Sequence, residues 1–161
     1  MPCVHAANAA FQWGELDSYR DATLSYTGKP LWTYEFAHRK LDIRLEASVG
    51  WVQAPAGASA DRGLWHVGLA PAVRYWITPQ TGVEYVVGAN LFSGIRLGDK
   101  DISTAFQFGN SIGLFHRLGN SPWTLGLRIT HYSNADIKRP NPGQNYIQAR
   151  VSYAFDKMSR P

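Results

Sequence analysis

The sequence predicts an all-β protein, namely an eight-stranded antiparallel transmembrane β-barrel. Several segments alternate apolar and polar residues with the period of two that is typical of strands. Charged residues make up 17% of the 161 residues, below the roughly 25% usual in soluble domains, whereas aromatic residues reach 13%. This composition suits a membrane barrel with aromatic girdles. A transmembrane helix is excluded because no run of about 18 apolar residues exists.

The two ends of the chain are predicted to lie outside the barrel, which is expected to span residues 11–156. Residues 1–10 lack the charged start and apolar stretch of a full secretory signal, yet residues 7–9 have the small-x-small form of a cleavage site. We therefore expect either a truncated signal-peptide remnant or a flexible terminus. Residues 157–161 are expected to form a C-terminal tail.

Eight segments are candidate strands, separated by alternating short turns and longer loops. These segments cover residues 11–13, 19–26, 41–51, 65–75, 83–91, 102–115, 123–133 and 147–155. Residues 31–39 are predicted to be a connection. Bacterial outer-membrane barrels have short periplasmic turns and longer outer loops. With the N-terminus in the periplasm, the loops at 54–63, 94–101 and 134–143 would face outside, at the outer leaflet.

One face of these strands carries charged residues that are predicted to point into the barrel. They are Asp42, Arg44, Glu46, Arg74, Glu84, Arg128 and Arg150. Buried charges are costly unless paired, and a narrow eight-stranded barrel brings them close enough to pair without leaving a channel. A soluble barrel that binds a small ligand would place apolar residues inside instead. That alternative would fractionate without detergent.

The segment that ends the strand at 123–133 carries the residues with the most evident chemistry. The alternation of apolar and polar residues places His131 and Ser133 on the outward, apolar face, with Cα atoms roughly 6 to 7 Å apart. A serine needs an adjacent base to act as a nucleophile, and an ionisable residue at membrane depth marks a functional site. If this face meets lipid, the predicted substrate is a lipid.

His-x-Ser-Asn followed by Lys-x-Pro-Asn-x-Gly, at residues 131–143, resembles the signature of the lipid A 3-O-deacylase (PagL) family of outer-membrane enzymes. The resemblance implies a serine esterase that hydrolyses the ester at the 3 position of lipid A and releases a 3-hydroxy fatty acid. Ser133 would attack, and His131 would act as base and then as acid. The implied location is the outer membrane, with the site facing the outer leaflet.

The same resemblance implies further roles around this pair. The Asn134 side chain and the backbone amides of residues 135 and 136 would stabilise the oxyanion. Phe108 would line the groove for the acyl chain. Lys138 and Arg139 would meet the phosphates or core sugars of lipopolysaccharide.

Two positions depart from the family pattern. Where the family has a third catalytic residue, a Glu, this chain has the amides Gln144 and Asn145. Strand parity favours Asn145 as the residue that orients His131, and Gln144 remains the alternative. Loss of the carboxylate cost about 10⁴ in kcat in one Ser-His-Asp triad, but papain-like proteases function with Asn, so we expect partial impairment. Asp136 stands where the family usually has Gly, and one hypothesis is that it partly replaces the acid by orienting His131.

The sequence leaves one functional alternative within the same fold, a catalytically weakened homologue that binds lipopolysaccharide or serves as a structural barrel. Lipid A, lipopolysaccharide and outer-membrane lipid are the predicted partners. The net charge of +4 is spread along the chain without a basic stripe, so a nucleic-acid partner is not predicted. No cofactor or metal is predicted. Cys3, the single cysteine, is expected near a removed segment. A homodimer is compatible with the sequence, which does not specify the oligomeric state.

Overall fold

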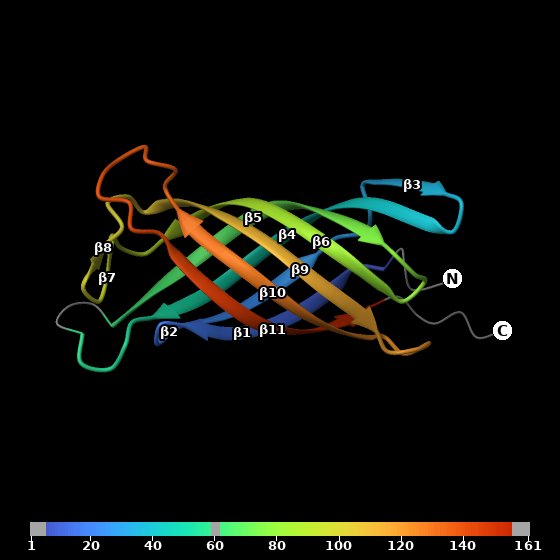
Figure 1. The fold of residues 1–161 in the computed structure, drawn as a ribbon, viewed down its shortest axis with the longest axis horizontal. Helices are drawn as coiled ribbons and strands as arrows, with labels where there is room; N and C mark the ends of the chain where they lie inside the picture. The colour runs from blue at the N-terminus through green and yellow to red at the C-terminus, as the bar shows by residue number, and fades with distance from the viewer. Residues whose placement is uncertain (1–5, 59–61, 156–161) are drawn as a thin grey trace.

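The computed structural model describes residues 6–58 and 62–155 and shows a closed antiparallel barrel of eight strands (Figure 1). The barrel strands are β1 (Asn8–Leu16), β2 (Tyr19–Thr27), β4 (Arg39–Gln53), β5 (Gly63–Trp76), β6 (Thr81–Phe92), β9 (Phe106–Arg117), β10 (Trp123–Ser133) and β11 (Gln144–Ala154). Neighbours in the chain pair with each other, and pairing of β1 with β11 closes the ring. The predicted fold is confirmed. None of the described residues forms a helix long and apolar enough to cross a membrane.

Three short strands lie outside the barrel proper. β3 (Trp32–Phe36) falls within the predicted connection and pairs with the first residues of β4. It takes the place of β2 there, because the pairing of β2 with β4 ends at Thr27 and Glu46. β7 (Arg96–Leu97) and β8 (Lys100–Asp101) form a small hairpin in the loop before β9. The strand predicted from residue 102 begins only at Phe106, because Ile102 turns into the apolar core.

Near the N-terminus, the described residues contribute to the barrel. β1 begins at Asn8, and the carbonyl oxygen of Ala6 accepts a hydrogen bond of 2.7 Å from the Arg44 guanidinium. The predictions for Cys3 and for residues 157–161 lie outside the described residues.

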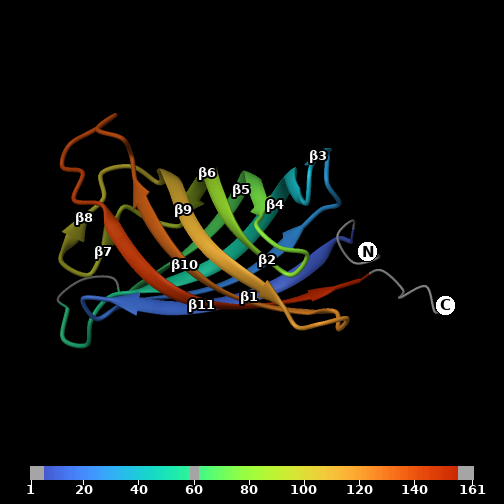
Figure 2. The ribbon, with the colours of Figure 1, turned by 45° about the vertical axis from the view of Figure 1, so that its right-hand side comes forward.

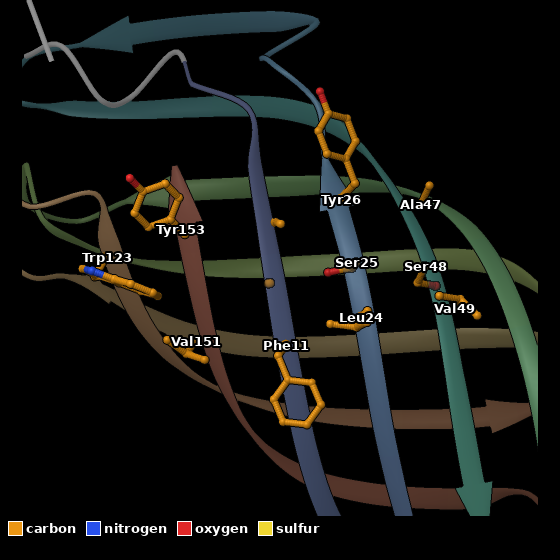
Figure 3. A pocket seen from close by; sticks show the side chains of 12 residues that line it. Phe11, Leu24, Ser25, Tyr26, Ala47, Ser48, Val49, Trp123, Val151 and Tyr153 are labelled. Atoms are coloured by element: carbon orange, nitrogen blue, oxygen red, sulfur yellow. The ribbon is translucent and has the colours of Figure 1, made fainter. Parts of the chain in front are cut away.

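The outer wall carries aliphatic side chains between two bands of aromatic residues, as membrane barrels do. One band lies near the chain termini and includes Tyr26, Trp32, Tyr34, Trp123 and Tyr153. The band at the opposite end includes the pair Trp51 and Trp65, whose ring centroids are 5.0 Å apart. An apolar hollow of about 580 Å³ lies on this wall beside the first band, between Phe11, Leu24 and Tyr153 (Figure 3).

The middle of the barrel is filled by an ionic network. Arg128 contacts Glu46 at 2.8 Å and Glu84 at 2.6 Å, while Arg150 contacts Glu46 at 2.8 Å and Arg74 contacts Glu84 at 3.0 Å. All five of these side chains are buried, and so are Asp42 and Arg44, which pair at 2.7 Å. The predicted inward charges are therefore confirmed as a paired core.

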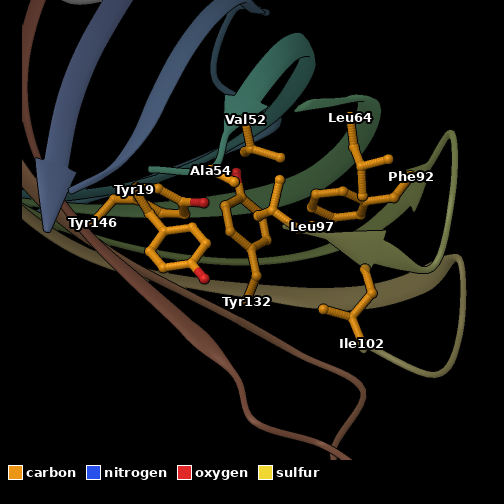
Figure 4. Close-up of a cluster of buried hydrophobic side chains, with 9 residues drawn as sticks. All are labelled: Tyr19, Val52, Ala54, Leu64, Phe92, Leu97, Ile102, Tyr132 and Tyr146. Carbon is orange, nitrogen blue, oxygen red and sulfur yellow. The ribbon is translucent and has the colours of Figure 1, made fainter. Parts of the chain in front are cut away.

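Apolar side chains close the end of the lumen away from the termini (Figure 4). The cluster contains Tyr19, Val52, Ala54, Leu64, Phe92, Leu97, Ile102, Tyr132 and Tyr146. Leu97 and Ile102 come from the loop between β6 and β9, so this loop folds back over the barrel mouth. It thereby supports the adjacent loop 134–143 from within.

Candidate active site

The site lies where β10 ends, at the barrel mouth opposite the termini (Figures 1 and 2). Along β10 the exposed residues are Trp123, Leu125, Leu127 and Ile129, and His131 continues this outward row with partial exposure. The prediction that His131 faces outward is confirmed.

One hydrogen bond fixes the His131 ring. Asn145 lies directly opposite His131 on β11, and its Oδ1 is 2.7 Å from His131 Nδ1. Because the amide oxygen can only accept, Nδ1 carries the proton and donates it. Nε2 is then the unprotonated nitrogen and is available as a base.

Ser133 ends the strand two residues beyond His131, and its side chain is 9% exposed. Its register partner on β9 is Phe108, whose ring contacts Phe106 at a centroid distance of 4.9 Å. The structure therefore brings Phe108 next to Ser133, on the wall that carries the aliphatic row. Within the described part of the chain, no hydrogen bond joins His131 to Ser133.

Gln144 points the other way from Asn145. Its side chain is buried, with Oε1 accepting from Lys100 Nζ and Nε2 donating to the backbone carbonyl of Asn145 at 2.8 Å. Lys100 also lies 4.4 Å from the centre of the Tyr19 ring. Of the two amides left open by the sequence, only Asn145 contacts His131 in this structure.

Asn134 holds the two outer loops together. Its fully buried side chain donates from Nδ2 to the carbonyl oxygens of Lys138 at 2.8 Å and Ile102 at 3.2 Å. Both amide hydrogens are thus committed, and no free N–H of this side chain remains for an oxyanion in this conformation. The predicted donors that stay uncommitted are the backbone N–H groups of Ala135 and Asp136, which donate to no other described residue.

Asp136 lies in the exposed loop rather than at the imidazole. Its carboxylate accepts from Asn141 Nδ2 at 3.2 Å and lies 3.5 Å from the Arg139 guanidinium. The Nδ1 atom of His131 is already bound by Asn145, so the structure does not bring Asp136 into the proposed orienting role. Lys138 and Arg139 are exposed on the same loop.

The structure adds neighbours of the site that sequence reasoning did not single out. Asn110 lies opposite His131 on β9. The sequence marks it only as a polar residue in an outward row that otherwise contains Phe and Ile. Gly143 adopts a positive φ of 62°, and a Cβ atom there would lie 2.8 Å from the His131 ring. Ser103 donates to the carbonyl oxygen of Pro140 at 2.6 Å. No pattern of period two marks Gly143 or Ser103, because both lie in loops.

Comparison with known proteins identifies the family of this chain. The sequence model of the family described as Lipid A 3-O-deacylase (PagL) matches residues 51–154, from the last three residues of β4 to the end of β11. The chain belongs to the lipid A 3-O-deacylase (PagL) family. Lipid A deacylase PagL of Bordetella bronchiseptica is 36% identical over 150 residues, which cover 91% of this chain and 82% of that protein.

Two further relatives extend the comparison. Lipid A deacylase PagL of Pseudomonas aeruginosa is 38% identical over 61 residues, or 38% of this chain and 35% of that protein. A crystal structure of the outer membrane enzyme PagL superimposes with a TM-score of 0.80 at 22% identity, covering 91% of this chain and 98% of that one. The structural likeness shows that this chain shares the barrel fold of that enzyme.

Proposed function

We propose that this chain is a lipid A 3-O-deacylase in which Ser133 is the nucleophile and His131 the general base. The observation that carries the proposal is the His131–Asn145 hydrogen bond of 2.7 Å, which leaves Nε2 of the ring free on the face shared with Ser133. Membership of the PagL family supplies the substrate class, because both curated relatives are lipid A deacylases.

The proposed reaction follows from these groups. Ser133 Oγ attacks the carbonyl carbon of the 3-O-linked acyl ester while His131 Nε2 takes its proton. The backbone N–H groups of Ala135 and Asp136 stabilise the tetrahedral oxyanion. Collapse breaks the bond to the sugar oxygen, which receives the proton from His131. Water then attacks the acyl-enzyme with His131 again as base, which releases a 3-hydroxy fatty acid and restores Ser133.

Asn145 is proposed to keep the imidazole in the correct tautomer without supplying charge. A neutral amide does not stabilise the imidazolium as a carboxylate does, so we expect a slower enzyme than one with Glu at this position. The acyl chain would lie against Phe108 and the aliphatic row of β10. Lys138 and Arg139 would face the phosphates or core sugars of lipopolysaccharide.

The site is proposed to face the outer leaflet, where lipopolysaccharide resides. The connections that follow β4, β6 and β10 lie at the site end, as expected of outer loops, whereas the connection that carries β3 lies at the opposite end. In a Cys3→Ser background, a cysteine in place of exposed Arg139 should react with a membrane-impermeant maleimide in intact cells, whereas one in place of exposed His38 should not. The reverse labelling pattern would refute this orientation.

The test of function is mass spectrometry of lipid A from a Gram-negative host that expresses the chain. The expected result is lipid A lacking one 3-hydroxyacyl chain. A Ser133→Ala variant, shown to be folded in the membrane, serves as the control and should leave lipid A intact. Unchanged lipid A with the wild-type barrel folded in the membrane would instead favour the weakened homologue.

A further inference from the structure

A second candidate site lies at the barrel end that carries the termini. Figure 1 shows the turn of the β3–β4 hairpin and the turn between β5 and β6 at this end. A cleft of about 450 Å³ is lined by residues of both turns. The cleft is lined by Glu35, Ala37, His38, Arg39, Lys40, Trp76, Thr78 and Pro79. Basic residues thus outnumber acidic ones around it.

Lys40 is the member of this cleft that requires explanation. Its side chain is 8% exposed, and its Nζ is buried without a hydrogen-bond partner among the described residues. An ammonium group that is withdrawn from water without an acceptor is strongly disfavoured. Lysine has a flexible stem, so a small rotation can turn Nζ toward the adjoining cleft.

The nearby carboxylates of Asp42 and Glu35 attract this charge, but neither accepts a hydrogen bond from Lys40 Nζ. Asp42, the next inward residue of β4, accepts from Arg44 Nε at 2.7 Å and from Trp76 Nε1 at 2.7 Å, so both of its oxygens are engaged. Glu35 opposes Lys40 in the β3–β4 register but forms no ion pair with it within the described chain. Arg117 adds positive charge at this end of the lumen, and its Nε also lacks a partner among the described residues.

We propose that this cleft binds a phosphate group, held by Lys40 together with His38 and Arg39. Lysine binds phosphate as a point charge, and the arginine guanidinium offers several donors to its oxygens. Arg39 uses one of these donors on the Tyr75 hydroxyl at 2.6 Å, and His38 is exposed at the turn. A volume of about 450 Å³ accommodates a phosphodiester headgroup as well as a free ion.

The outer side of the same hairpin points to a lipid as the source of the phosphate. Trp32, Tyr34 and Phe36 form a stacked row with centroid distances of 6.0 and 5.7 Å, and the row continues to Tyr75 at 6.1 Å. Exposed aromatic rows of this kind lie at the headgroup level of membranes. A glycerophospholipid would thus place its phosphate in the cleft and its chains along the row. Free phosphate shares the headgroup chemistry, so the two sources must be separated by experiment.

The first experiment measures the thermal unfolding midpoint of the full chain in neutral detergent against inorganic phosphate at constant ionic strength. A ligand that binds only the folded state raises this midpoint saturably. We expect such a rise for the wild type and at least about tenfold weaker phosphate binding for Lys40→Gln. The control Arg20→Gln removes an exposed cation at the opposite end, paired with Glu15, and should respond like the wild type.

The second experiment identifies the source by native mass spectrometry after incubation with phosphatidylglycerol or with diacylglycerol. Retention of phosphatidylglycerol alone, lost in Lys40→Gln, assigns a lipid headgroup. A midpoint response to phosphate without retained lipid assigns free phosphate. If Lys40→Gln does not fold, His38→Gln replaces it, with an expected severalfold weaker response. Equal responses in all variants, or no phosphate response in the wild type, would overturn the proposal.

Discussion

At the scale of single residues, the site depends on what holds the His131 ring. Asn145 accepts from Nδ1, which fixes the tautomer, and Gly143 leaves the ring room because a Cβ atom there would lie 2.8 Å from Cε1. In the proposed mechanism, orientation and charge are thus separable functions of the residue that contacts His131 Nδ1. In this chain the structure retains the first function while the amide lacks the second.

Replacement of Asn145 with Glu should raise deacylation by about tenfold or more, since a carboxylate there stabilises the imidazolium that forms during catalysis. The measurement is the initial rate of fatty acid release from purified lipid A in detergent. Gln144→Glu is the matched comparison, because Gln144 faces Lys100 rather than His131. A gain in activity at position 144 and none at 145 would contradict the proposed geometry.

Replacement of Asp136 with Gly should leave deacylation undiminished or increase it. Asp136 has a positive φ of 60°, which glycine adopts without the strain of about 1 kcal/mol that other residues incur. The change also removes a negative charge from beside the proposed oxyanion donor. The same rate assay decides the matter: if the folded variant loses activity, the Asp136 carboxylate does help to orient His131.

At the scale of elements, the loop between β6 and β9 fixes the loop that follows Ser133. Two contacts join these loops, from Ser103 to Pro140 and from Asn134 to Ile102, and a third joins Lys100 to Gln144, the first residue of β11. These contacts bridge 32 to 44 residues of sequence and arise from loops without periodicity. No local pattern in the sequence could therefore predict them.

Strand parity predicted the parts of the site that lie on regular elements. It placed His131 and Asn145 outward, and the register then sets them opposite each other. β3 was missed although Trp32, Tyr34 and Phe36 alternate, because the strand is short and follows the Gly28-Lys29-Pro30 break. The sequence could not predict that the Asn134 amide is already hydrogen-bonded or that Asp136 lies away from His131. Both features depend on side-chain partners that only the folded loop brings together.

Alkaline pH should test the contact made by Lys100 in this loop. Burial lowers the pKa of Lys100 below its ordinary value of 10.5, although Asp17 acts in the opposite direction. Between the lowered pKa and 10.5 the unfolded chain binds more protons than the folded chain, so the free energy of unfolding rises with pH in that window. At pH values below this window, Lys100 is charged in both states, and the free energy of unfolding is reduced by the full cost of burying that charge.

We therefore expect the wild type to gain stability relative to Lys100→Met as the pH is raised from about 8 to 10.5, because the variant lacks this titration. Urea-induced unfolding of both proteins in detergent measures the difference between their free energies of unfolding at each pH. Taking this difference removes the contribution of the tyrosines, which both proteins contain. A difference that is flat, or that falls with pH, would show that burial does not lower the pKa of Lys100.

At the scale of the whole molecule, one paired network connects most strands of the barrel. Arg128 on β10 reaches Glu46 on β4 and Glu84 on β6, and Arg150 on β11 shares Glu46 with it. Gln12 on β1 accepts from both arginines, at 3.3 and 2.8 Å. Because these contacts cross the lumen, they brace the wall on which His131 and Ser133 are held.

Arg128→Leu should therefore destabilise the entire barrel rather than the site alone. It leaves the carboxylates of Glu46 and Glu84 with fewer buried partners, and removal of one partner from a buried ion pair typically costs about 3 to 5 kcal/mol. Arg20→Gln breaks the exposed pair with Glu15 and should cost less than about 1 kcal/mol. Urea-induced unfolding in lipid vesicles compares the two variants with the wild type. Equal small losses would mean that the lumen is hydrated enough to screen Glu46 and Glu84, and that the stiffness of the wall comes from the backbone ladder instead.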